Sequence, residues 1–211
     1  MNKNKMATRV LTVMALCIGI NYIGGTIALW LRLPIYLDSI GTIFAGALLG
    51  PVPGMLTGLS SGILSGVTTD IFSLYYSPIQ ILTGLLAGLI LPRYLGKDKN
   101  SLKLLLLALI LSVPGTIVSS IITVQLFGGI TSSGSSMIVQ LLHGLGLSQT
   151  TSVILVQVGT DYLDRLLSIV VVSLVITMLP QRLIYSKRKR FYNILCWWKI
   201  ESDFLLTLFS S

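Results

Sequence analysis

An aspartate, Asp38, interrupts an apolar stretch near the start of the chain, in the sequence LPIYLDSIGT at residues 33–42. Tyr36 precedes it and the hydroxyls of Ser39 and Thr42 follow it, so one short segment offers a carboxylate, a phenol and two alcohols. These groups donate and accept hydrogen bonds. A carboxylate in apolar surroundings is costly without a partner. The segment therefore indicates either a binding site for a polar ligand or the polar start of a helix.

The side chains that enzymes use are too few to assemble a catalytic site. His143 is the only histidine, and Cys17 and Cys196 stand near opposite ends of the chain with no metal-ligand spacing. The sequence contains no Ser/His/Asp set, HExxH motif, phosphate-binding glycine loop or pair of catalytic carboxylates. We therefore expect a protein that is not an enzyme and that uses no cofactor or metal.

The composition is that of an integral membrane protein. Hydrophobic residues make up 53% of the chain and charged residues 10%, with a mean hydropathy of +0.87, whereas soluble domains carry about 25% charged residues. The net charge is +8, but the basic residues lie in clusters between apolar runs and no nucleic-acid-binding motif accompanies them. The expected surroundings are a lipid bilayer, and nucleic acid is not an expected partner.

The apolar runs predict an all-α protein with a six-helix transmembrane bundle, because a helix needs about 20 apolar residues to cross the hydrocarbon. The predicted helices cover about residues 7–30, 34–50, 55–69, 78–95, 102–127 and 163–180. The second and third are short and are separated by the sequence GPVPG, so they are either tilted crossings or a re-entrant hairpin. The moderately apolar segment 137–159 is an extra element. Asp161, Asp164 and Arg165 are predicted to form the polar first turn of the last helix.

Glycines recur every four residues through the third predicted helix, and two more follow on the next one. Small residues at this spacing let helix backbones approach closely in lipid, which predicts close packing within one bundle. The glycines are Gly50, Gly54, Gly58, Gly62, Gly66, Gly84 and Gly88.

The basic residues predict which side of the membrane each end of a helix faces. With six crossings, 13 of the 15 lysines and arginines fall on one side, and only Arg32 and Arg165 fall on the other. Because basic residues favour the cytoplasmic side, we expect a multi-pass plasma-membrane protein with both termini in the cytoplasm. The loops near 31–38, 69–78 and 127–136 are then outside.

Two stretches carry a resemblance to a known family. LPIYLDSIGTIFAGALLGPVPGMLTGL and, more weakly, DYLDRLLSIVVVSLVITMLPQRL resemble the substrate-binding S components of energy-coupling factor (ECF) vitamin transporters. The first stretch matches the family pattern at Leu37, Asp38, Ile40, Gly41, Thr42, Gly50, Pro51, Gly54 and Gly58. The second departs from it at Arg165, where lysine is usual. The resemblance covers about residues 7–184, so we expect a membrane substrate-binding domain over 1–184 and a basic, aromatic cytosolic tail over 185–211.

The resemblance implies a substrate-capture subunit that binds a water-soluble vitamin or vitamin precursor at the outer face. It also implies a transmembrane coupling protein and two ATPase subunits as partners. The family docks on the coupling protein through small residues of the first helix, here Ala15 and Gly19, although these two could instead belong to internal packing. The alternatives from other classes are a membrane ligand sensor or scaffold and a stand-alone small-molecule carrier.

The expected ligand contacts lie in the outer loops and the adjoining helix ends. They are Asn21, Trp30, Tyr36, Asp38, Thr42, Tyr75, Tyr76 and Gln80. For Asp38 the residues leave two interpretations open: it lies in the ligand pocket, paired with a ligand donor, a backbone N–H or Arg32, or it is only a helix cap. The helix starts either at Pro34, which puts Asp38 and Thr42 on one face, or after Asp38 as its N-cap.

Overall fold

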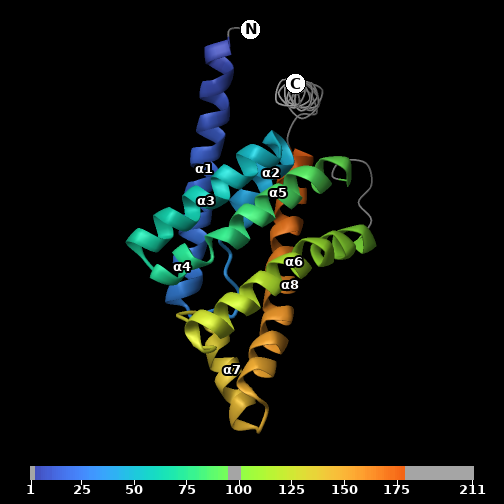
Figure 1. The fold of residues 1–211 in the computed structure, drawn as a ribbon. Helices are drawn as coiled ribbons and strands as arrows, with labels where there is room; N and C mark the ends of the chain where they lie inside the picture. The colour runs from blue at the N-terminus through green and yellow to red at the C-terminus, as the bar shows by residue number, and fades with distance from the viewer. Residues whose placement is uncertain (1–2, 95–100, 179–211) are drawn as a thin grey trace, which may run out of the picture.

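The computed structural model describes residues 3–94 and 101–178, and every regular element in these two ranges is a helix. The helices follow one another in the order shown in Figure 1. Their bounds are α1 Lys3–Trp30, α2 Ile40–Leu49, α3 Pro51–Thr68, α4 Ile71–Tyr75, α5 Ser77–Tyr94, α6 Ser101–Phe127, α7 Ser135–Gly144 and α8 Gln149–Met178. The tail predicted over 185–211 lies outside the described residues.

Two of these helices are long and apolar enough to cross a membrane, over Thr8–Trp30 in α1 and over Leu102–Phe127 in α6. The start of α1 and the end of α8 lie at the same end of the molecule, as Figure 1 shows. The beginning of α1 extends beyond the other helices there. The loop after α1 and helices α4 and α7 lie towards the other end.

The break predicted at GPVPG is confirmed, and it lies at one residue. Gly50 has a φ of 106°, which favours glycine, and Pro51 occupies the first turn of α3, where its missing N–H is not needed. The predicted starts of α2 are both wrong, because this helix begins at Ile40 with Ser39 as its N-cap. Pro34 and Asp38 therefore precede the helix, and Asp38 is neither its cap nor on a helical face with Thr42.

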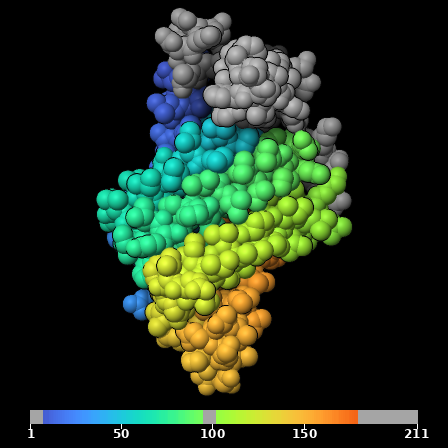
Figure 2. All heavy atoms as spheres, in the orientation of Figure 1, coloured from blue at the N-terminus to red at the C-terminus, as the bar shows by residue number. Residues whose placement is uncertain are grey.

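The glycine series of α3 packs against α5, as the spacing predicts. A side-chain carbon added to Gly54 would lie 2.6 Å from the Gly84 carbonyl oxygen, and one added to Gly58 would lie 2.5 Å from the Gln80 carbonyl oxygen. No residue larger than glycine fits at such distances without a shift of the backbone. Figure 2 shows α3, α5 and α6 side by side on one face of the molecule. This close packing fixes where the first turns of α5 lie.

The predicted start of the last helix is wrong. Helix α8 begins at Gln149, not near Leu163, so the extra segment 137–159 is α7 followed by the first third of α8. Asp161, Asp164 and Arg165 are consequently buried in the middle of a 30-residue helix. The helix continues through them because its polar groups lie on one face, whereas its other face carries exposed apolar side chains such as Leu155 and Val158.

The apolar core lies between α2, α5, α6 and α8. Its fully buried side chains include Ile43, Leu91, Leu111, Ile169 and Val172. Leu91, Leu111, Ile169 and Val172 come from the halves of α5, α6 and α8 away from the loop that follows α1, whereas Ile43 lies in the first half of α2. The polar residues of α8 lie nearer that loop, so an apolar core supports a polar layer beneath the loops.

Candidate functional site

An open cavity lies where the three predicted outer loops come together. It encloses about 940 Å³ of space between atoms, including its open mouth. Its walls come from the loop between α1 and α2, from α4 and the start of α5, from the loop between α6 and α7, and from the middle of α8. The lining residues with polar side chains are Tyr36, Asp38, Ser65, Thr69, Asp70, Ser73, Tyr76, Gln80, Ser119, Thr131, Ser132, Ser133, Asp161, Asp164 and Arg165.

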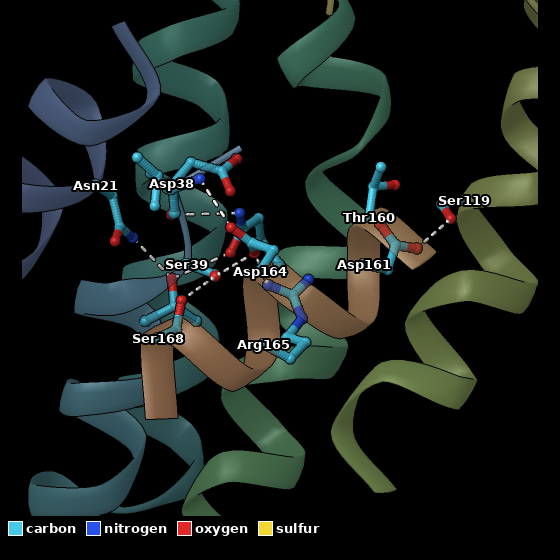
Figure 3. Close-up of polar contacts among 12 residues, drawn as sticks. Asn21, Asp38, Ser39, Ser119, Thr160, Asp161, Asp164, Arg165 and Ser168 are labelled. Carbon is cyan, nitrogen blue, oxygen red and sulfur yellow. Dashed lines mark hydrogen bonds and ion pairs between the residues drawn. The ribbon is translucent and has the colours of Figure 1, made fainter. Parts of the chain in front are cut away.

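Asp164 of α8 fastens the loop between α1 and α2 to the helix bundle. Its carboxylate accepts a hydrogen bond from the Leu37 backbone N–H at 2.8 Å and another from the Ser39 hydroxyl at 2.8 Å. Arg165 donates to the same carboxylate at 3.0 Å in a buried ion pair. Figure 3 shows Asp164 between the loop and Arg165, with Ser168 one turn further along the helix. These bonds hold Leu37 in a left-handed conformation, with a φ of 52°, and thereby aim the neighbouring Tyr36 and Asp38 side chains.

A chain of buried amides and hydroxyls connects α1, α2 and α5 to the same loop. The Asn21 side chain donates to the Thr42 hydroxyl at 2.8 Å, and that hydroxyl donates to the Gln80 side-chain oxygen at 3.2 Å. Gln80 in turn donates to the Asp38 carbonyl at 3.3 Å. Asn21 also accepts from the Gly41 N–H at 2.6 Å, at the first turn of α2. This network fixes the position of the loop from the opposite side.

The remaining polar wall is formed by α6 and the loop that follows it. Asp161 accepts a hydrogen bond from the Ser119 hydroxyl of α6 at 2.9 Å, and in Figure 3 its carboxylate points towards that helix. The Tyr36 hydroxyl lies 3.2 Å from that of Ser133, in the loop between α6 and α7. Tyr76 contacts the Thr123 hydroxyl at 2.5 Å. Aromatic rings therefore stand beside carboxylates around one opening.

Burial changes the acidity of the loop carboxylate. Desolvation, with a smaller contribution from the nearby Asp164 carboxylate, raises the pKa of Asp38 to about 6. Asp38 is therefore mostly ionised at neutral pH but readily protonated just below it. Arg32, the partner considered from the sequence, has an exposed side chain.

Half of the eight predicted ligand contacts line the cavity. Tyr36, Asp38, Tyr76 and Gln80 do so. The other four lie elsewhere: Asn21 and Thr42 are buried in the network beneath, whereas Trp30 and Tyr75 have exposed side chains outside the lining. Asn21 and Thr42 position Gln80 and the first turn of α2, so their part in the site is indirect. Only the four residues that line the cavity remain proposed ligand contacts.

Sequence reasoning missed the α8 residues of the site. Asp161, Asp164, Arg165 and Ser168 are spaced three, four and seven residues after the first of them, which puts them on one side of a helix. That spacing was the available signal, because ionisable residues within an apolar helix usually have a functional role. The signal is missed when the three charged residues are interpreted as the start of a helix, where acids suit the helix dipole.

Comparison with known families agrees with the resemblance in the sequence. The profile of the family described as ECF transporter, substrate-specific component, matches residues 9–191. The chain belongs to this family. Curated proteins and solved structures gave no match.

Membership sets the class of the protein. Its family consists of transporter components rather than enzymes, in agreement with the expectation from the missing catalytic motifs. Together with the apolar helices it identifies a membrane protein with a role in transport. The resemblance of LPIYLDSIGT to S components is confirmed at the level of the family.

Proposed function

We propose that this S component captures a water-soluble vitamin or vitamin precursor from outside the cell in the cavity between its loops. The observation that carries the proposal is the convergence of three loops and α8 on one open cavity with both polar and apolar walls. Pockets for small organic molecules combine apolar walls with a few well-placed polar groups. Tyr36, Phe72 and Tyr76 supply aromatic rings, and Gln80, Asp161 and Arg165 supply polar groups.

The proposed arrangement in the membrane is a six-helix bundle made by α1, α2, α3, α5, α6 and α8, with both termini in the cytoplasm. Two observations support it: the biased basic residues, and the location of the start of α1 and the end of α8 at one end of the molecule. Helix α2 has only 10 residues. It spans about 15 Å, so α2 and α3 together make either a partial crossing pair or a re-entrant hairpin, and both return the chain to the same side.

The proposed partners are a transmembrane coupling protein and two ATPase subunits, with Ala15 and Gly19 at the contact. Ala15 is exposed, and a side-chain carbon added to Gly19 would meet no atom within 4 Å. This differs from Gly24 and Gly41, whose added carbons would collide with the loop backbone and with α1, respectively. Ala15 and Gly19 thus have no packing role in the described residues, which supports an external contact through closely approaching helices.

Co-purification tests the proposal and separates it from the sensor and carrier alternatives. The tagged chain, solubilised gently from its native membrane, should bring down a coupling protein and ATPases. Ala15→Trp should abolish that association and leave ligand binding by the isolated chain intact. A chain that transports its ligand when reconstituted alone would instead be a carrier. Loss of ligand binding in Ala15→Trp would assign Ala15 to internal packing.

A further inference from the structure

The charged groups of the cavity are unbalanced. Four carboxylates line it, and the lining contains one guanidinium, that of Arg165, and no lysine or histidine. The carboxylates belong to Asp38, Asp70, Asp161 and Asp164. An anionic ligand would add a further negative charge to this group, which is unfavourable at low dielectric constant.

Two of the four carboxylates are already engaged by the protein. Asp164 is bound by Leu37, Ser39 and Arg165, as described above. Asp70 caps α4 through the Phe72 N–H and accepts a hydrogen bond from the Ser132 hydroxyl. These two acids have structural roles, and the negative charge of Asp164 balances the positive charge of Arg165.

Asp161 and Asp38 lie near Arg165 and Asp164, but among the described residues neither of their carboxylates forms an ion pair as Asp164 does. Asp161 is nine-tenths buried and accepts from the Ser119 hydroxyl, which carries no charge. Asp38 lies beside Gln80, whose amide is also neutral. Both carboxylates have room to accept hydrogen bonds from a ligand, since a carboxylate offers about four acceptor positions.

Arg165, by contrast, has a hydrogen-bond donor that lacks an acceptor in the part of the chain that the structure describes. Its side chain is almost completely buried and it lines the cavity, yet its Nε–H has no acceptor among the described residues. An unsatisfied buried donor is costly. A ligand acceptor that reached this N–H would remove that cost, so the site requires both donors and an acceptor from its ligand.

We infer that the cavity selects a neutral or cationic nitrogen heterocycle that offers N–H donors to Asp161 and Asp38 and an acceptor to Arg165, and that it excludes carboxylate anions. The inference rests on the proposed capture function. The rings of Tyr36, Phe72 and Tyr76 line the same cavity and suit stacking against a flat ring. Because hydrogen bonds to a charged group are strong, we expect the cavity to bind donor-bearing heterocycles about ten- to a hundredfold more tightly than carboxylates.

Binding to two groups of probes tests the inference. The full chain in lipid nanodiscs is titrated calorimetrically with thiamine, pyridoxamine and riboflavin as donor-bearing heterocycles, and with biotin, pantothenate and nicotinate as carboxylates. The tightest binder should come from the first group. A carboxylate as the tightest binder overturns the inference while leaving the capture function intact. A chain that binds none of the six overturns the inference, and the capture function is then tested separately by the ligand that the chain retains through purification.

Variants assign the preference to the residues. Asp161→Asn keeps the bond from Ser119 but removes the charge, and should weaken the best donor-bearing probe at least about tenfold. Gly19→Leu changes α1 outside the cavity lining, where an added carbon meets no atom within 4 Å, and should alter affinity less than about threefold. Asp38→Asn is the second test if Asp161→Asn does not fold. Unchanged affinity in a folded Asp161→Asn or Asp38→Asn protein would overturn the assignment.

Discussion

At the scale of single residues, Asp164 is the group on which the geometry of the site depends most. Three donors from two parts of the chain meet at its carboxylate. Asp164→Ala leaves Arg165 as an unpaired buried charge and frees the loop, and should lower the free energy of unfolding by about 3 kcal/mol or more. Thermal unfolding of the purified chain in detergent measures this. Ser168→Ala, which removes only one neighbouring hydroxyl, is the control and should cost about 1 kcal/mol.

An Asp164→Ala protein as stable as Ser168→Ala would contradict that account. Asp164→Asn should fall between the two, because an amide still accepts from one donor but no longer balances the guanidinium.

Asp38 gives a prediction about pH. Since its pKa is raised to about 6, the folded chain binds a proton in a range where the unfolded chain does not. Stability should therefore rise as the pH falls from 7 towards 4.5, with most of the change below pH 6, where the folded chain holds the proton and the unfolded chain does not. In Asp38→Asn this contribution is absent, so the difference in melting temperature between the two proteins should change with pH. A difference that stays constant over this range would show that Asp38 is not buried as described.

At the scale of helices, the packing of α3 on α5 depends on glycine. Gly58→Leu places a side chain against the Gln80 carbonyl and should separate the two helices, lowering both the melting temperature and ligand affinity, because Gln80 lines the cavity. Gly19→Leu is the matched control, since an added carbon there meets no atom within 4 Å. It should leave the isolated chain as stable as the wild type. Equal losses in the two variants would contradict this assignment of the glycines.

The helices also show how far the sequence alone could lead. The packing of Gly54 and Gly58 could be predicted because it depends on local spacing. The start of α8 could not be predicted from average hydropathy, because Gln157, Asp161 and Asp164 lower the average although they form one bonded face. The spacing indicates that these residues share a face, and their partners, which lie far away in the sequence, show what that face contacts.

Some of the predicted ligand contacts could likewise be identified from the sequence, and others could not. Tyr36 and Gln80 were found because they lie in or beside loops expected at one end of the bundle. Asn21 and Thr42 are polar residues of the same kind, but they bond to each other beneath the cavity. Sequence patterns give the type of residue and its approximate depth in the bundle, whereas the packing of α1 against α2 sets the direction of the Asn21 and Thr42 side chains.

At the scale of the whole molecule, the account requires the cavity to open outside the cell. Single cysteines at positions 98 and 133, in a chain without its own cysteines, should react differently with a membrane-impermeant thiol reagent applied to whole cells. Position 133 lies in the loop at the cavity and should be labelled, whereas position 98 lies in the basic segment between α5 and α6 and should be protected. Labelling at 98 but not at 133 would reverse the orientation.

The most direct test of substrate capture is the ligand that the chain itself retains. The protein is expressed in its native host and purified in mild detergent, and mass spectrometry identifies and counts the bound small molecules. We predict one small heterocyclic compound per chain, strongly reduced in Asp161→Asn and retained in Gly19→Leu. A wild-type protein without a bound small molecule that also fails to bind one on titration, or equal occupancy in Asp161→Asn and the wild type, would contradict the account of this cavity as the capture site.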